Sequence, residues 1–126
     1  MLSKKEIAIN YINFLEKGNI TDVLSLFTKN GIVDSPVYGV MNAHQFYNKL
    51  NNDTTNSELD LKGIFEEKDS NSLALYFKYK WTLKNNQKVE FDVVDIIEFD
   101  TSNKITKLKI IYDTVISREL VKQLES

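Results

Sequence analysis

The side chain with the most distinctive chemical setting is Asp95, a carboxylate on an otherwise apolar strand face. Alternate residues from position 89 onward share one face of an expected strand, and five of the six are apolar: Val89, Phe91, Val93, Asp95, Ile97 and Phe99. A shift of one residue would turn every large apolar group of this strand towards water, so the register is strongly determined. We therefore expect Asp95 to point into the interior of the protein.

A buried carboxylate must be hydrogen-bonded, paired with a cation or protonated, because an unpaired buried charge is very costly. No lysine or arginine is obviously placed to pair with Asp95. Removal from water would then raise its pKa, and a neutral carboxyl can donate a hydrogen bond to an oxygen that gains negative charge. In the alternative interpretation, Asp95 accepts hydrogen bonds from Tyr or Trp side chains and only fixes the core.

Three aromatic residues with polar atoms share the expected interior. Tyr11 lies in the apolar stripe of the first expected helix, and Tyr79 and Trp81 lie on the inward face of a strand at residues 73–83. Buried Tyr and Trp side chains usually pack in the core with their polar atom satisfied. Together with Asp95, however, they are also typical of an apolar ligand pocket with a few polar anchors.

The composition excludes several kinds of chemistry. The chain has no cysteine, so disulfides, thiolate catalysis and cysteine-bound zinc are excluded. Its only histidine, His44, is expected to be exposed in the first turn of a helix, without partners at metal-ligand spacing. We therefore predict neither a metal site nor a cofactor.

The charge pattern argues against nucleic acid and membrane partners. The formal net charge is -2, acidic residues are interleaved with the lysines, and Arg118 is the only arginine. Phosphate-binding surfaces usually carry a basic stripe with arginines, so the row of Lys78, Lys80 and Lys84 is interpreted as a solvated strand face. No apolar run approaches the length of a membrane span, and no signal sequence precedes the first helix, so a cytoplasmic protein is expected.

The first half of the chain shows helical patterns. Ser3 and Glu6 form a capping-box signature, and apolar residues at helical spacing follow until Gly18. Asn19 is expected to cap a second short helix that includes Phe27 and ends at residues 30–31. A short strand at residues 32–35 and a third helix starting after residue 42 complete this half.

From residue 57 onward the apolar period changes to two, which is typical of strands. The pattern predicts strands at about 57–65, 72–83, 89–100 and 105–114, with turns between them, and a terminal helix at 115–124. Residues 1–126 are therefore expected to form a single α+β domain. Long antiparallel strands with one apolar face twist strongly, so the sheet should curl around the N-terminal helices as a cone and leave a hollow.

The order of these elements resembles the nuclear transport factor 2-like superfamily, which includes the SnoaL-like proteins and ketosteroid isomerase. The resemblance in element order extends over essentially the whole chain, and the matching stretches are residues 10–11 with 18–19, 32–37, 46–47, 94–99 and 104–113. The resemblance implies that Tyr11 and Asp95 correspond to the tyrosine and the protonated acid of an oxyanion hole, with Tyr47 supporting the tyrosine. The family's general base would stand at Ser35, and Asp34 faces the other side of the strand, so isomerisation by the family route lacks its base.

A second resemblance concerns the limonene-epoxide-hydrolase-like branch, in which paired carboxylates around an arginine activate water. Asp95 and Asp113 could stand for the carboxylates, but Val93 occupies the position of the arginine. Asp113 and Arg118 follow a SnoaL-like pattern that implies a local ion pair at the start of the terminal helix.

These observations predict a protein that binds a small apolar molecule in a conical pocket, with an isomerase- or hydratase-type activity as one hypothesis. The expected catalytic residues are Tyr11 and Asp95, and the expected ligand-binding residues are Ser35, Tyr47, Tyr79, Trp81, Phe91 and Tyr112. The alternative is a non-catalytic homodimeric ligand-binding or protein-interaction module. The family resemblance implies a homodimer through the outer sheet face, where Val94 and Ile96 form an apolar patch. A protein-interaction module would need exposed apolar area at Tyr76, Val94 and Ile96.

Overall fold

One curved sheet with helices against its concave face makes up residues 1–125, the part of the chain that this computed structural model describes. The helices are α1 (Lys4–Glu16), α2 (Ile20–Ser25), α3 (Ala43–Asn52) and α4 (Val115–Leu124). The strands are β1 (Phe27–Ser35), β2 (Gly39–Asn42), β3 (Thr54–Glu66), β4 (Ser72–Leu83), β5 (Lys88–Phe99) and β6 (Ile105–Ile111). The α+β class predicted from the sequence is confirmed.

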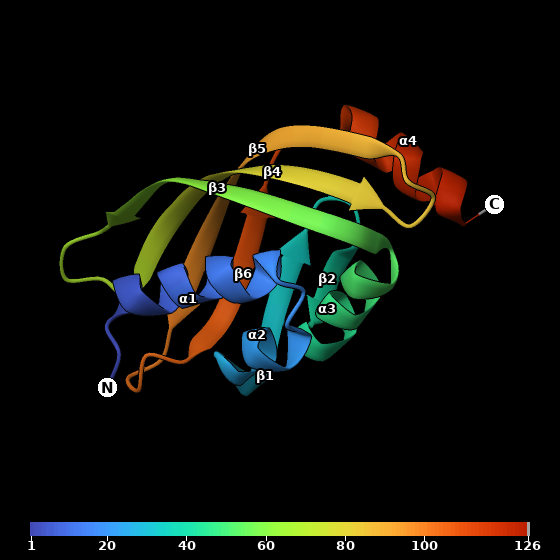
Figure 1. Ribbon diagram of the computed structural model, residues 1–126. Helices are drawn as coiled ribbons and strands as arrows, with labels where there is room; N and C mark the ends of the chain where they lie inside the picture. The colour runs from blue at the N-terminus through green and yellow to red at the C-terminus, as the bar shows by residue number, and fades with distance from the viewer. Residues whose placement is uncertain (126) are drawn as a thin grey trace.

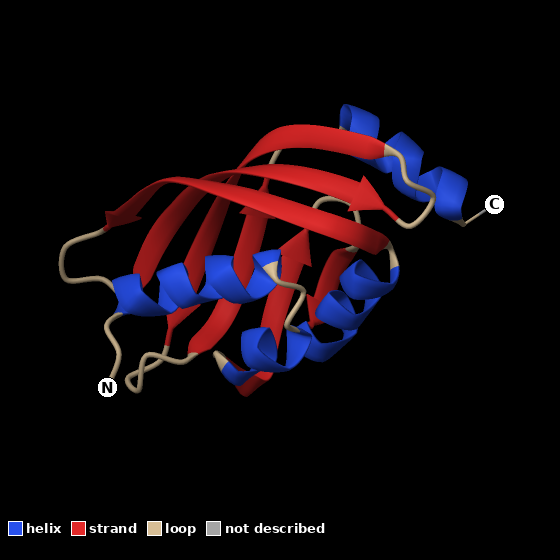
Figure 2. Ribbon diagram, viewed as in Figure 1, coloured by secondary structure: helices blue, strands red, loops and turns tan. Residues whose placement is uncertain are grey.

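The six strands lie in the order β2-β1-β6-β5-β4-β3. Strands β3 to β6 follow one another as antiparallel neighbours, as the sequence predicted, whereas β1 pairs with β6 in parallel. Figures 1 and 2 show β3, β4 and β5 arching over α1, while α3 lies at one end of the concave side. The sheet is open, and its twisted long strands form the wall of a cone around the helices.

The first helix forms for the reasons that its sequence indicates. The Ser3 hydroxyl accepts a hydrogen bond from the Glu6 amide at 3.1 Å, and the Glu6 carboxylate accepts one from the Ser3 amide at 3.2 Å. This reciprocal capping box satisfies two amides that the first turn leaves without helical partners. Gly18 ends the segment with φ of +69°, a conformation that glycine adopts without steric strain. The buried face of α1 is the predicted one: Ile7, Ala8, Tyr11, Ile12 and Leu15.

The second helix is shorter than predicted, and the prediction that it contains Phe27 and ends at residues 30–31 is wrong. Helix α2 ends at Ser25, and Phe27 begins β1. The reason is a long-range pairing, since the Ile105 amide donates to the Leu26 carbonyl at 2.9 Å and Phe27 lies opposite Ile105 on β6. Strand β6 is also shorter than predicted and ends at Ile111 instead of residue 114.

The alternation of β5 is confirmed, with one inward residue, Phe91, half-buried. Val89, Val93, Asp95, Ile97 and Phe99 are buried, and Asp95 is only 1% exposed. In the sheet, Asp95 lies between Leu75 on β4 and Ile110 on β6. The sequence therefore located this carboxyl correctly, on the concave face at the centre of the sheet.

Candidate functional site

A narrow cavity lies between the concave face of the sheet and the helices. Its volume is about 40 Å³, which leaves room for only a few water molecules. Helices α1 and α3 supply one side, strands β4, β5 and β6 the other, and the turn between β1 and β2 reaches its rim. The lining residues are Tyr11, Ser35, Tyr38, Phe46, Leu50, Phe77, Tyr79, Trp81, Phe91, Val93, Asp95, Ile110 and Tyr112.

Asp95 is the only carboxyl in this lining, and it has no polar partner in the described part of the protein. Neither of its carboxyl oxygens forms a hydrogen bond within residues 1–125. Burial raises the pKa of Asp95 well above its usual range, because the charged form would lose its hydration without compensation. The interpretation of Asp95 as an acceptor that fixes the core through Tyr or Trp is therefore not supported by the structure.

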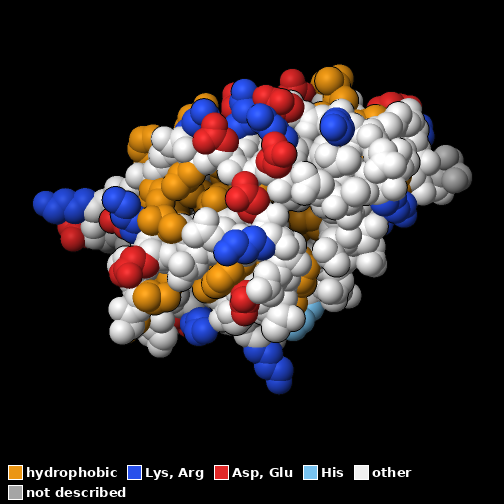
Figure 3. Space-filling model, in the orientation of Figure 1, with side chains coloured by type: hydrophobic (Ala, Val, Ile, Leu, Met, Phe, Trp, Pro, Cys, Tyr) orange, Lys and Arg blue, Asp and Glu red, His pale blue; other side chains and the backbone are white. Residues whose placement is uncertain are grey.

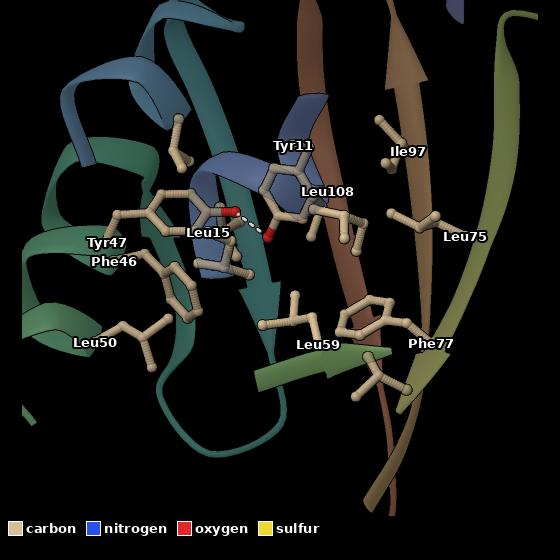
Figure 4. Packing of buried hydrophobic residues seen from close by; sticks show 14 of the residues in the cluster. Tyr11, Leu15, Phe46, Tyr47, Leu50, Leu59, Leu75, Phe77, Ile97 and Leu108 are labelled. Carbon is tan, nitrogen blue, oxygen red and sulfur yellow. Dashed lines mark hydrogen bonds between the residues drawn. The ribbon is translucent and has the colours of Figure 1, made fainter. Parts of the chain in front are cut away.

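Two buried tyrosines meet beside Asp95. Their hydroxyls, those of Tyr11 and Tyr47, lie 2.7 Å apart in a hydrogen bond, shown as the dashed line in Figure 4. Burial raises the pKa of both hydroxyls well above its usual range, and a charge on nearby Asp95 would raise them further. Tyr11 lines the cavity, whereas Tyr47 lies behind it and contacts Phe46 and Phe27 edge-on or at a tilt. Tyr47 therefore has no surface in the cavity, and its influence there is the hydrogen bond that orients the Tyr11 hydroxyl.

Two polar aromatic residues of the wall, Tyr79 and Trp81, already have hydrogen-bond partners on β3. The Tyr79 hydroxyl shares a hydrogen bond of 2.7 Å with Ser57, and the Trp81 indole donates to the Thr54 hydroxyl at 2.8 Å. These groups leave Asp95 as the wall's unsatisfied polar side chain. Tyr79 and Trp81 thus serve mainly as apolar surface.

A stacked aromatic pair extends this wall to the rim. The rings of Phe91 and Tyr112 lie 4.3 Å apart with an interplanar angle of 16°, and Tyr79 is 5.7 Å from Phe91. Burial raises the pKa of Tyr112 to about 12, so its hydroxyl is protonated at neutral pH. The result is a broad aromatic surface that leads from solvent towards Asp95.

The rim contains one residue that the sequence analysis missed. Ser35 lines the cavity as expected, and its hydroxyl accepts a hydrogen bond from the Tyr38 amide at 3.0 Å. Tyr38 also lines the cavity and donates its own hydroxyl to Asp53 at 2.7 Å. No periodicity could reveal Tyr38, because it lies in a turn; the only local signal is the Ser35-Pro36 turn that precedes it.

Comparison with known proteins finds structures of the same fold, whereas the sequence comparisons find no match. No protein-family model matches the sequence, and no curated protein matches it significantly. SalBIII, described as an epoxide hydrolase/cyclase-like enzyme in pyran ring formation in polyether salinomycin, matches with a TM-score of 0.76 at 17% identity, over 87% of this chain and 90% of its own. TerC, crystallised with polyporic acid, matches with a TM-score of 0.79 at 15% identity, over 94% and 98%.

A further solved structure has the same architecture over almost its entire length. It is an NTF2-like protein of unknown function from Burkholderia pseudomallei, with a TM-score of 0.82, 11% identity, and coverage of 96% of this chain and 98% of that one. The chain has the nuclear transport factor 2-like fold. The resemblance noted in the sequence is thereby confirmed for the architecture.

Within this nuclear transport factor 2-like fold, the expected second carboxylate does not reach the cavity. Asp113 accepts a hydrogen bond from the Val115 amide at 3.1 Å, at the start of α4, and is not part of the lining. The predicted ion pair between Asp113 and Arg118 is absent from residues 1–125; Arg118 donates instead to the Thr114 hydroxyl at 2.8 Å and to the Pro36 carbonyl. Paired-carboxylate activation of water therefore has no geometric basis here.

Other kinds of site find no support in the described residues. Positions 1–125 hold no cluster of three or more residues that could bind a metal ion, and none of their helices is long and apolar enough to cross a membrane. On the face shown in Figure 3, acidic and basic side chains are interspersed over β3 and α1, with hydrophobic side chains between the two elements. That face carries no basic stripe of the kind that binds phosphates.

Proposed function

We propose that the cavity binds a small apolar molecule that carries one hydrogen-bond-accepting oxygen, and that neutral Asp95 donates to that oxygen. The observation that supports this proposal is the buried Asp95 carboxyl, which has no partner within residues 1–125 and faces an aromatic wall. An unsatisfied buried polar group destabilises a protein. A ligand oxygen would relieve that cost, and the aromatic wall would bind the remainder of the ligand.

Tyr11 can supply a second hydrogen bond to the same oxygen. When Tyr47 donates to Tyr11 across their 2.7 Å contact, the hydrogen of the Tyr11 hydroxyl is free to point into the cavity. Two donors on one oxygen polarise a carbonyl or an ether oxygen and stabilise the negative charge that develops on it. Tyr11 and Asp95 are therefore the proposed catalytic residues, with Tyr47 as the residue that orients Tyr11.

The catalytic form of the proposal is an isomerase- or hydratase-type reaction that begins with proton donation. Asp95 would protonate the substrate oxygen and become a carboxylate. The added water in a hydration, or the carbon next to the activated group in an isomerisation, would then lose a proton to that carboxylate, which restores neutral Asp95. One residue serves as acid and then as base because Ser35 is not a base and no other carboxylate lines the cavity. SalBIII, the epoxide hydrolase/cyclase-like neighbour, supports an oxygen-bearing substrate by analogy of fold alone.

Two ligands that differ only at the oxygen test the proposal. Cyclohexanone and methylenecyclohexane have similar shapes, but only the ketone accepts a hydrogen bond. Asp95→Leu should weaken cyclohexanone binding by about tenfold, the value of one such hydrogen bond, and leave methylenecyclohexane binding unchanged or stronger. Asp95→Asn keeps a hydrogen-bond donor at this position, so its affinity for cyclohexanone should fall much less. Equal losses for both ligands in Asp95→Leu would contradict the proposal; NMR titration provides the affinities.

A second proposal concerns the outer face of the sheet, where we infer a homodimer contact. Tyr76, Val94 and Ile111 lie side by side on neighbouring strands, and Ile111 is 48% exposed. The ring of Phe65, 61% exposed, folds over Gly63 next to this row. The apolar surface runs across four strands, exposed at Phe65 and Ile111 and half-buried at Tyr76 and Val94, and it supports association with a second copy.

The test of this contact is a charge in the middle of the row. Val94→Lys should shift a dimer to monomer in sedimentation experiments, because the lysine would be buried without a partner. Val115→Lys, at an exposed position of α4 (76% exposed), is the matched control and should change nothing. A monomeric wild-type protein, or a dimer that persists in Val94→Lys, argues against this interface.

A further inference from the structure

The mouth of the cavity is formed where several strands end. Ser35 is the last residue of β1, Tyr112 follows β6, and Phe91 lies near the start of β5. Tyr38, in the turn between β1 and β2, completes this ring, in which Ser35 is buried and the three aromatic side chains are half-buried. With the mouth in this arrangement the cavity measures only about 40 Å³, whereas sites for drug-sized ligands are roughly 300–1,000 Å³. Entry of a ligand therefore requires a side chain at the mouth to move.

Tyr38 is fixed by a charged group that lies outside the cavity. Its hydroxyl donates to the Asp53 carboxylate at 2.7 Å, and Asp53, at the C-terminal end of α3, is 3% exposed. Lys49 and Lys84 lie 3.5 and 3.6 Å from that carboxylate and balance its charge. Hydrogen bonds to charged groups are stronger than those between neutral groups, so this contact holds the ring in place more firmly than apolar packing alone.

The turn has both apolar and polar contacts, and Val37 and Tyr38 pack against the hydrophobic core. The Tyr38 ring packs against Phe46 at 5.8 Å between centroids, and the Lys49 ammonium lies 5.5 Å above the ring. Residues 36–38 form a turn outside the β1–β2 ladder, and the Tyr38 amide bonds to the Ser35 hydroxyl. From the other side, Arg118 of α4 donates to the Pro36 carbonyl. The pairing of Ser35 with Gly39 closes the ladder on both sides of the turn and fixes its backbone, so the freedom to move lies in the Tyr38 side chain, which can rotate without breaking the sheet.

We propose that Tyr38 is the gate of the cavity and that its hydrogen bond to Asp53 is the latch. In the closed arrangement, the Tyr38 ring limits the cavity to the size of a few water molecules. Release of the latch moves the ring aside and admits a ligand, so Tyr38 determines the size of the molecule that enters. This inference rests on the proposed function in one respect: it takes the cavity as the ligand site.

The chain contains a natural reporter for the gate. Trp81 is its only tryptophan, lines the cavity and is 3% exposed. Acrylamide, a small neutral quencher, must pass the mouth to reach the indole from the cavity side. Tyr38→Phe keeps the ring and removes only the latch, and we expect the quenching constant of Trp81 to rise several-fold, because losing a hydrogen bond to a charged group shifts an opening equilibrium by roughly tenfold. Thr106→Val, which removes a side-chain hydrogen bond to the Glu98 carbonyl outside the cavity, is the matched control.

A second variant keeps the test decisive. Asp53→Asn weakens the latch from its other side and should also increase quenching of Trp81, while far-UV circular dichroism verifies that each variant is folded. The proposal is overturned if Trp81 is quenched no more strongly in Tyr38→Phe than in Thr106→Val, even if it is quenched strongly in Tyr38→Ala. That result would mean that the Tyr38 ring blocks the mouth by its bulk and that its hydrogen bond to Asp53 plays no part. Acrylamide needs no contact with Asp95. The quenching experiment therefore tests the gate separately from the proposed hydrogen bond between Asp95 and a ligand, and either proposal can be contradicted while the other stands.

Discussion

At the residue scale, the main feature is the difference between Asp95 and the other polar groups of the cavity. Tyr79 and Trp81 have partners in Ser57 and Thr54, whereas the Asp95 carboxyl has none within residues 1–125. Alternation along β5 was enough to place Asp95 inside. It could not show which polar groups would be satisfied, because the partners of Tyr79 and Trp81 lie more than twenty residues away on another strand.

The unsatisfied carboxyl predicts an unusual dependence of stability on pH. Because burial raises the pKa of Asp95, the folded protein keeps a proton that the unfolded chain releases near its model value of about 3.9. Stability from this group is complete below that pH and is lost as pH rises towards the folded-state pKa. The amide side chain of the Asp95→Asn variant is neutral at every pH, so this variant should be more stable than wild type at neutral pH. The difference in free energy of unfolding is about 1.4 kcal/mol for each tenfold by which Asp95 binds its proton more tightly in the folded protein than in the unfolded chain.

Urea unfolding between about pH 3 and pH 8 measures this difference. The stabilities of wild type and Asp95→Asn should converge at the acidic end and separate as pH rises. Asp92→Asn, on the exposed face of the same strand, should show no such separation. A gap between wild type and Asp95→Asn that stays constant with pH would refute the assigned protonation state.

At the element scale, local patterns predicted most segments, and the errors arose where distant strands compete with a local helix signal. The capping box at Ser3 and the alternation of β4 and β5 depend on near neighbours, and both are confirmed. The end of α2 depends on β6, almost eighty residues away, which draws Phe27 into parallel pairing. Tyr38 was missed for a similar reason, because its role comes from Asp53 and from the shape of the rim.

One contact between elements predicts a local change in dynamics. The Glu16 carboxylate, at the end of α1, accepts a hydrogen bond from the Leu59 amide at 2.8 Å and thereby covers the free edge of β3. Glu16→Leu should increase hydrogen exchange at the Leu59 amide by roughly tenfold, since the amide loses a charged acceptor. Glu66→Leu, at the other end of β3, is the control. An unchanged Leu59 exchange rate in Glu16→Leu would show that the contact does not hold the edge.

At the scale of the whole molecule, the order of elements was sufficient to predict the cone-shaped fold, because twisted strands with one apolar face must wrap around the only helices available. The narrowness of the cavity was not predictable. It depends on how Tyr38, Phe91 and Tyr112 pack at the mouth, and that packing combines residues from three separate strand ends. The fold thus sets the conical shape of the sheet, and the packing of the side chains at its rim sets the volume of the cavity.

The central claim is that Asp95 is a neutral hydrogen-bond donor inside the cavity, and carbon-13 NMR of the side-chain carboxyls tests it most directly. We expect the Asp95 signal to stay at its protonated shift from acidic to neutral pH, because burial raises the pKa of this carboxyl. A titration of Asp95 near the model value of about 3.9 would mean that the buried group is charged in the folded protein. That result would contradict the proposed donor role.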